Sequence, residues 1–258
     1  MTANGRMAST AMDQAANRSK LYGHRARIGY CSPPPTAEVF PYEFYRIVPD
    51  GVTLVLTTLA VTELSQAELD QSYDMSIKAA RAMVAAGVDI VVFGGVPINL
   101  SRGGDMAATI ASLEAELQVK VSTSASAQQK AMRVLGCKRV VIAHGYDASQ
   151  HARQSSYAEK YGCEVLGVAG WGAALPNFGG IPRDAALEMG RSLMREHPGA
   201  DSILFPSPHW PTIEAIAPLE REFGVNVVSA SQAAIWDSLR LAGVADKIED
   251  YGRLFRDF

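Results

Sequence analysis

The stretches Ile90-Val91-Val92-Phe93-Gly94-Gly95 and Ser202-Ile203-Leu204-Phe205-Pro206-Ser207 are the two clearest buried strands of this chain. Each is an unbroken apolar run that ends in small or turn-forming residues, as expected for a parallel strand covered on both faces. The second stretch follows the first at a separation of 112 residues, and the earlier apolar runs at Ile28 and Val140 have the same separation. We therefore expect the chain to consist of two similar halves.

Apolar runs alternate with helix-like segments along the rest of the sequence. We expect strands at 27–31, 53–57, 90–93, 119–121, 139–143, 163–168, 202–205 and 225–228, and helices at 68–86, 105–117, 126–135, 152–161, 183–196, 213–223 and 233–242. This alternation predicts an α/β fold with two pseudo-symmetric, doubly wound lobes and short parallel sheets. Ligands bind beyond the carboxyl ends of the strands in such sheets, so we expect the active site in the interlobe cleft.

The same pattern predicts how the chain divides. Residues 1–26 are polar and form an N-terminal arm; they contain no apolar core of a secretory signal. We expect lobe 1 at 27–125 and lobe 2 at 126–225, with the C-terminal segment 226–258 packing back on lobe 1.

Composition and charge exclude several classes of protein. The 24 basic and 27 acidic residues leave a net charge of −3, which disfavours a nucleic-acid binder because such proteins carry a basic excess. No window of about 18 apolar residues predicts a membrane span. The three cysteines, Cys31, Cys137 and Cys163, are too few for a disulfide scaffold, and we expect them to be buried thiols in a cytoplasmic protein. No zinc-type spacing appears, so we expect no metal.

Five loops at predicted strand ends are rich in hydroxyls, small residues and backbone amides. They are 32–35, 94–99, 122–124, 144–147 and 206–212. Amides ahead of a helix, together with Ser and Thr hydroxyls, form anion sites. The phosphate-binding glycine motifs are absent from the sequence, so we expect a small carboxylate as the ligand and no cofactor.

These loops and their flanks also resemble a known family. The similarity runs from about residue 27 to the C-terminus and is strongest at 201–212, 224–231 and 236–243, with further matches at 28–34 and 251–255. On these residues the chain is identified as a member of the aspartate/glutamate racemase superfamily, in the branch of arylmalonate decarboxylase and maleate cis-trans isomerase. The resemblance implies cofactor-free carbanion chemistry next to a carboxylate, in a cleft between two lobes.

The resemblance also implies two cysteine positions, and this chain has a cysteine at neither. Racemases use both cysteines, the decarboxylase uses the second to protonate an enediolate, and maleate isomerases use the first as a nucleophile. Here the two positions are Gly95 and Ser207. Two-base racemisation and cysteine-adduct isomerisation are therefore both disfavoured.

Three residues are the candidate catalytic groups. Ser207 stands at the second cysteine position, and His209 follows in a Ser-Pro-His-Trp-Pro stretch that is similar to Cys-Thr-His-Tyr-Pro of glutamate racemases. Serine needs a neighbouring base, and histidine is the side chain suited to proton transfer near neutrality. Tyr146 resembles the family tyrosine that donates a hydrogen bond to the substrate carboxylate.

A larger set is expected to bind the substrate. It comprises Ser32, Pro33, Gly95, Val96, Pro97, Asn99, Ser122, Thr123, Pro208 and Trp210. Val96 and Pro97 replace the Thr and Ser of the decarboxylase's carboxylate site, so this site must rely on other donors. We expect the Gly-rich loop around Trp171 and Phe178 to cover the cleft.

The favoured function is a cofactor-independent lyase or isomerase that acts on a small carboxylate or dicarboxylate through an enediolate, most similar to arylmalonate decarboxylase. The alternatives are a hydrolase or hydratase that uses Ser207 and His209, a maleate-isomerase-like enzyme, and a non-catalytic carboxylate-binding relative. No nucleic-acid or membrane partner is expected, and the family resemblance makes a homodimer plausible.

Overall fold

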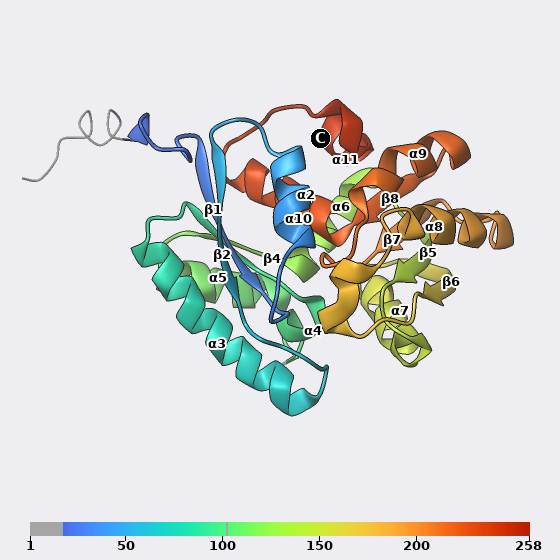
Figure 1. The fold of residues 1–258 in the computed structure, drawn as a ribbon, viewed down its shortest axis with the longest axis horizontal. Helices are drawn as coiled ribbons and strands as arrows, with labels where there is room; N and C mark the ends of the chain where they lie inside the picture. The colour runs from blue at the N-terminus through green and yellow to red at the C-terminus, as the bar shows by residue number, and fades with distance from the viewer. Residues whose placement is uncertain (1–17, 102) are drawn as a thin grey trace, which may run out of the picture.

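The computed structural model describes residues 18–101 and 103–258. It contains two four-stranded parallel sheets with helices on their faces, as the sequence predicted (Figure 1). The strand orders are β2-β1-β3-β4 and β6-β5-β7-β8. Most of the predicted N-terminal arm, residues 1–17, lies outside the described residues.

The strands follow the predicted apolar runs closely, because unbroken runs bounded by Gly and Pro leave little freedom in their ends. Their bounds are β1 Ala26–Ser32, β2 Val52–Thr58, β3 Ile90–Phe93, β4 Lys120–Thr123, β5 Arg139–His144, β6 Glu164–Gly170, β7 Ser202–Phe205 and β8 Asn226–Ser229. All neighbouring strands pair in parallel.

The helices connect and cover these strands. Their bounds are α2 Val39–Ile47, α3 Gln66–Ala85, α4 Val96–Asn99, α5 Met106–Leu117, α6 Ser124–Leu135, α7 His151–Lys160, α8 Ala185–Glu196, α9 Ile213–Phe223, α10 Ala230–Leu241 and α11 Arg253–Asp257, with short 3-10 turns at Ala148–Gln150, Leu175–Gly180 and Glu249–Tyr251. The described part of the chain contains no helix that is long and apolar enough to cross a membrane.

The predicted internal repeat appears in the strand register. In the first sheet Ile28 pairs with Ile90, and in the second Val140 pairs with Ser202, which are the same positions shifted by 112 residues. The central pair of strands is therefore equivalent in the two sheets. The loops that follow β3 and β7 consequently occupy corresponding places.

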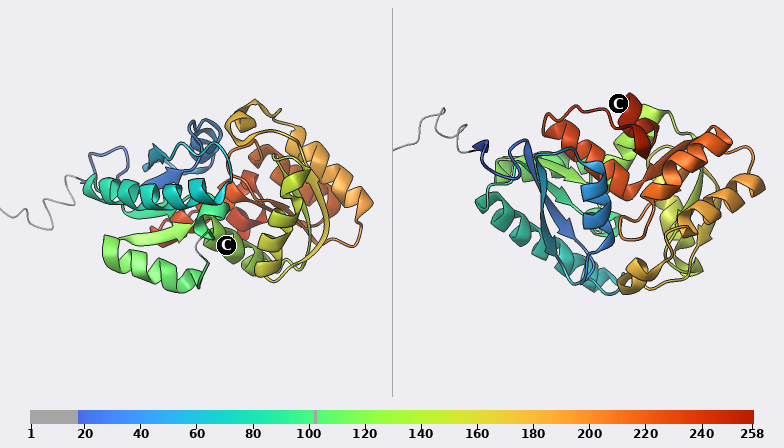
Figure 2. Two further views of the ribbon diagram at one scale, coloured as in Figure 1. Left: turned by 90° about the horizontal axis from the view of Figure 1, so that it is seen from below. Right: turned by 45° about the horizontal axis from the view of Figure 1, so that its top comes forward.

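The helices that follow the last strand of each sheet pack together. Thr123 caps α6 and Ser229 caps α10, each through a reciprocal capping box. The two helices contact each other; α6 also contacts β8, and α10 also contacts β3 and β4. In Figures 1 and 2, α10 lies between the two sheets. Each of the two helices thus packs against a strand of the other sheet, and these contacts join the two halves.

Three of the described α-helices were not predicted: α2, α4 and the short C-terminal α11; the first two contain proline, which is unfavourable inside helices. Helix α2 carries Pro41 in its first turn, and α4 carries Pro97 near its start. Proline is tolerated at these positions because first-turn amides have no partner within the helix.

The division of the chain into lobes at 27–125 and 126–225 stays a prediction. Strand β8, which begins the segment 226–258, pairs with β7 and thus belongs to the second sheet. Helix α10 of the same segment contacts the first sheet and α2. At the front, Arg18 forms an ion pair with Asp89 at 2.6 Å, so the described end of the predicted arm is held on the first half.

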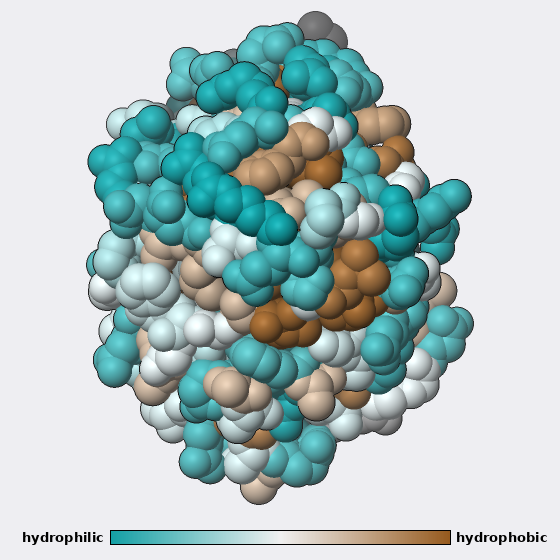
Figure 3. Space-filling view, turned by 90° about the vertical axis from the view of Figure 1, so that its right-hand side faces the viewer, coloured by the Kyte–Doolittle hydropathy of each residue, from teal (hydrophilic) through white to brown (hydrophobic). Residues whose placement is uncertain are grey.

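The surface on the side of α8 and β6 is mostly hydrophilic. Figure 3 shows hydrophobic residues there as small patches between polar ones. Such a mixture is ordinary for a face in contact with water.

Candidate active site

A small cavity lies where the carboxyl ends of β3 and β7 meet. Its volume is about 20 Å³, which is room for about one water molecule. It is lined by Pro33, Val61, Leu64, Gly95, Val96, Pro97, Ile98, Tyr146, Gln154, Leu175, Pro206, Ser207, Pro208 and His209. Both halves of the chain contribute, so the cavity occupies the place where the sequence predicted the active site.

Ser207 and Tyr146 form the polar centre of this cavity. Ser207 is 4% exposed, and its hydroxyl has no hydrogen-bond partner. Burial raises the pKa of Tyr146 well above its usual range, and the neighbouring Ser207 hydroxyl partly offsets that rise. Phe178 packs edge-on against the Tyr146 ring, with ring centroids 4.7 Å apart. Tyr146 is therefore a protonated, fixed phenol that faces Ser207.

His209 lines the same cavity but lies in an apolar environment. Burial lowers its pKa to about 3, and its Nε2 has no hydrogen-bond partner. The ring is consequently neutral at physiological pH. Because neither Ser207 Oγ nor His209 Nε2 has a partner, the two do not bond to each other, and no nucleophile–base pair is formed in this structure.

Gly95 lines the cavity from the first half of the chain. Its φ of +79° belongs to the region that favours glycine, and a Cβ built there would lie 2.6 Å from Pro33 Cγ. The Gly95 amide donates to Ser124 Oγ at 3.2 Å. This position therefore excludes any side chain, whereas the equivalent position in the second half carries the Ser207 hydroxyl.

Several residues predicted to bind substrate lie outside the cavity wall, because their polar atoms hold the fold together. The Asn99 amide binds the Phe93 carbonyl and the Ala125 amide. Ser122 donates to Asp237 at 2.5 Å, and Thr123 caps α6. These are structural contacts at the strand ends.

Ser32 and Trp210 are also outside the lining, for a different reason. Both are fully buried, at 0% exposure. Trp210 packs edge-on against Phe205, with ring centroids 5.8 Å apart. Its apolar environment comes from the core rather than from the cavity.

The structure adds residues that sequence reasoning missed. Gln154 brings a side-chain amide from α7, and Leu175 comes from the Gly-rich loop that was expected to cover the cleft. Val61 and Leu64 come from the loop after β2. A glutamine on the buried face of an otherwise ordinary helix was the one available signal for Gln154.

The three cysteines take no part in the site. All are buried and free, and burial raises the pKa of Cys31 and Cys137 to about 12. Thiols with such pKa values are protonated and unreactive. The described residues contain no group of acidic, histidine and cysteine side chains arranged to hold a metal.

Two parallel sheets that share one apolar cavity, with a phenol and a hydroxyl on one side, define an α/β enzyme whose site lies between pseudo-symmetric halves. The family model for arylmalonate decarboxylase matches residues 28–255, and the chain belongs to this family. The arylmalonate decarboxylase of Bordetella bronchiseptica is 29% identical over 230 residues, covering 86% of this chain and 93% of that protein.

Solved structures agree with this assignment. A glycine-to-cysteine, cysteine-to-serine double mutant of arylmalonate decarboxylase in its liganded form has a TM-score of 0.81 at 25% identity, covering 90% of this chain and all of that one. The maleate isomerase Iso of Pseudomonas putida S16 has a TM-score of 0.80 at 18% identity, covering 90% and 98%. The maleate isomerase shares the fold, and the family match indicates that the chain is an enzyme of the decarboxylase type.

Proposed function

We propose that this enzyme removes CO2 from a small malonate-type dicarboxylate and protonates the resulting enediolate on one face. The observation that carries the proposal is the asymmetry of the cavity. A hydroxyl donor, Ser207, stands on one side, and the equivalent position on the other side is Gly95, which has no room for a side chain.

This asymmetry separates decarboxylation from racemisation. Racemisation needs a base on one face to remove a proton from carbon and an acid on the other to return it. Decarboxylation makes the carbanion by losing CO2 and then needs an acid alone. A carbanion next to a carboxylate is a far stronger base than an alkoxide, so even a weak acid such as a serine hydroxyl can protonate it.

The cavity wall provides different environments for the two carboxylates. The carboxylate that stays can accept hydrogen bonds from the Tyr146 phenol and the Gln154 amide, both on the cavity wall. The carboxylate that leaves would lie against Pro33, Val96 and Pro97. An apolar surface disfavours a charged carboxylate and favours neutral CO2.

The reaction balances with these groups and one water molecule, which is left as hydroxide. The bond between the central carbon and one carboxylate breaks, CO2 departs, and the electron pair stays on the carbon as an enediolate. Ser207 Oγ gives its proton to that carbon and is reprotonated by the Tyr146 phenol, which regains its proton from water. The product is a monocarboxylate with one new C–H bond.

Substrate binding requires the cavity to open. A malonate is much larger than the single water that about 20 Å³ can hold. Leu64 and Leu175 line the cavity from the loops that follow β2 and β6. Movement of these loops would widen it without disturbing the strand ends that hold Ser207 and Tyr146.

A single incubation tests the proposal. A malonate with one aryl and one methyl substituent on its central carbon is supplied in D2O, and the product is examined by NMR and chiral chromatography. We expect CO2 release and a monocarboxylate with one deuterium at the α-carbon, in one enantiomeric form. Absence of CO2 release, or α-deuterium exchange into the added monocarboxylate, would refute the proposal.

The alternatives have less support. A hydrolase needs a paired nucleophile and base, and Ser207 and His209 are not paired. Maleate isomerisation through a cysteine adduct needs a cysteine at the cavity, and the cysteines lie elsewhere. The cytoplasmic location and the homodimer stay predictions.

A further inference from the structure

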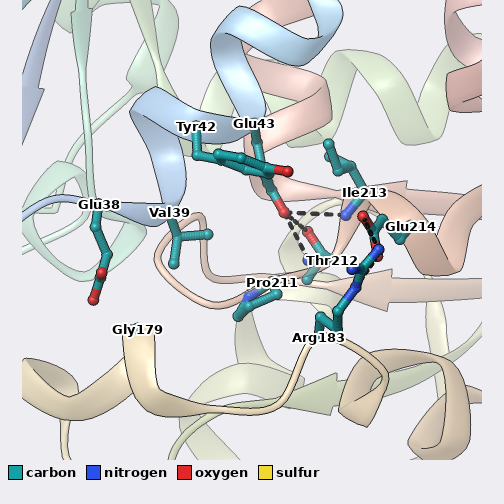
Figure 4. A pocket seen from close by; sticks show the side chains of 10 residues that line it. All are labelled: Glu38, Val39, Tyr42, Glu43, Gly179, Arg183, Pro211, Thr212, Ile213 and Glu214. Atoms are coloured by element: carbon teal, nitrogen blue, oxygen red, sulfur yellow. Dashed lines mark hydrogen bonds and ion pairs between the residues drawn. The ribbon is translucent and has the colours of Figure 1, made fainter.

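Glu43, in α2, is a carboxylate buried in the protein, with 2% of its surface exposed. Its Oε1 accepts hydrogen bonds from the backbone amides of Thr212 at 2.7 Å and Ile213 at 3.1 Å (Figure 4). Its Oε2 is bound by the Ser231 hydroxyl, at the start of α10. One side chain thus joins three segments that are far apart in the sequence.

A buried carboxylate costs free energy unless its charge is compensated. Here the partners are two backbone amides at the start of α9, where the helix dipole favours a negative charge, and the Ser231 hydroxyl at the start of α10. Desolvation still raises the pKa of Glu43 to about 7. Burial therefore destabilises the ionised form of Glu43, even with these hydrogen bonds.

A local cap could satisfy α9 more simply. Thr212 is the N-cap residue of α9, yet its side chain makes no capping hydrogen bond with the helix. Thr123 and Ser229, by contrast, cap α6 and α10 with their own side chains. The cap of α9 comes instead from a residue 169 positions away, so it ties the helix to another part of the fold.

The segment that Glu43 holds in place is the loop that carries the catalytic candidates. Residues 206–212 connect β7 to α9 and include Ser207 and His209. Pro206, Pro208 and Pro211 restrict the backbone of this loop because proline has a fixed φ. A stiff loop transmits the position of its anchored end at Thr212 to Ser207.

We propose that Glu43 is a positioning residue that anchors the loop 206–212 to α2 and α10 and so keeps the Ser207 hydroxyl opposite Tyr146. This inference rests on the proposed function of Ser207. Glu43 itself does not line the cavity and has no contact with the reacting atoms.

Solvent can reach this anchor through an outer pocket of about 340 Å³ between α2, the 179–183 segment and the start of α9 (Figure 4). Glu43, Thr212 and Ile213 are among its lining residues. The other ionisable groups facing the pocket are Glu38, Tyr42 and Glu214 with Arg183, and Arg183 is bound to Glu214. Because burial raises the pKa of Glu43 above that of an exposed glutamate, the buried arrangement favours the protonated carboxyl, so the loop is expected to loosen as the pH rises through about 7.

Three variants test the anchor: Glu43→Ala, Glu43→Gln and, as a control on the same pocket, Glu38→Gln. Hydrogen exchange of the Thr212 and Ile213 amides is measured on the free proteins, together with kcat and KM for the aryl malonate over pH 5.5–8.5. We expect Glu43→Ala to expose both amides to exchange and to lower kcat about 10- to 100-fold, with a much smaller change in KM.

Glu43→Gln keeps the acceptor for the amides and cannot ionise. We expect it to retain protection and most of kcat while losing the change in kcat near pH 7, and Glu38→Gln to behave as the unmodified enzyme. Unchanged amide protection in Glu43→Ala, or an unchanged kcat–pH profile in Glu43→Gln, would overturn the proposal. If Glu43→Ala does not fold, Ser231→Ala removes one bond to the same carboxylate and should give a smaller change in the same direction. The exchange readout needs no turnover, so it distinguishes failure of this inference from failure of the proposed function.

Discussion

The loops after β3 and β7 are equivalent by register and opposite in chemistry. After β3, Gly95 adopts a φ of +79°, and Pro33 occupies the space that a side chain at this position would need. After β7, Ser207 carries a hydroxyl that faces Tyr146. Equivalent positions of the two halves thus differ: one carries a hydroxyl and the other has no room for a side chain. In the proposed function, only the half with Ser207 supplies a proton donor, and one donor suffices because loss of CO2 itself makes the carbanion.

The largest expected effect comes from removing the active side of this comparison. Ser207→Ala should lower kcat for CO2 release about 100- to 1,000-fold, because the enediolate loses its proton donor. Ser72→Ala, which removes a hydroxyl from a buried serine of α3, serves as the control and should change kcat little. Equal activities of Ser207→Ala and the unmodified enzyme would assign the proton to another group.

The lack of space at Gly95 can be tested by introducing a side chain at this position. Gly95→Cys should destabilise the protein by about 2–4 kcal/mol, because it combines an unfavourable φ with overlap against Pro33. Gly243→Ala is the matched control: its φ is +76° and the space around it is open, so about 1 kcal/mol is expected. Urea denaturation measures both, and equal losses would show that Pro33 does not close this side.

A cysteine at position 207 tests the same comparison, because the resemblance places the decarboxylase's acidic thiol there. Ser207→Cys should raise kcat about 10-fold, because a thiol is a stronger acid than an aliphatic hydroxyl. The product should remain one enantiomer, since the proton still comes from one side. A racemic product in the chiral assay would contradict a single donor.

The smallest expected effect concerns His209 and the pH dependence of stability. Burial lowers its pKa from 6.5 to about 3 in the folded protein, so the unfolded chain binds more protons between these values. Its contribution to stability is therefore present above pH 6.5 and decreases as the pH falls toward 3.

The urea midpoint of the unmodified protein should consequently fall more between pH 7.5 and pH 5 than that of His209→Asn. His24→Asn changes an exposed histidine and is the control. Identical pH slopes for His209→Asn and the unmodified protein would mean that His209 is not held neutral by burial.

The alternation of strands and helices and the repeat of 112 residues could be predicted from the sequence because buried parallel strands are continuous apolar runs. The register pairs Ile28 with Ile90 and Val140 with Ser202, which confirms that repeat. The same apolar runs located the loops at 94–99 and 206–212, and these loops line the cavity.

The sequence was less informative about polar groups. Ser122 and Asn99 have the residue types of a binding site, yet their hydrogen bonds go to Asp237 and to backbone groups. Gln154 has one local signal, its place on the buried face of α7, and that signal does not say that it lines the cavity. A polar side chain's partner depends on which distant segment folds against it, and spacing along the chain does not contain that information.

By itself the sequence determined the two-sheet α/β architecture, the equivalence of Gly95 and Ser207, and the absence of cysteine from both positions. The tertiary structure alone decided that Pro33 occupies the space beside Gly95, that His209 is buried away from charge, and that Glu43 accepts a hydrogen bond from the Thr212 amide, 169 residues away. The physical reason is that strand and helix patterns arise from local periodicity, whereas overlap, desolvation and buried hydrogen bonds arise from contacts between segments that are distant in the chain.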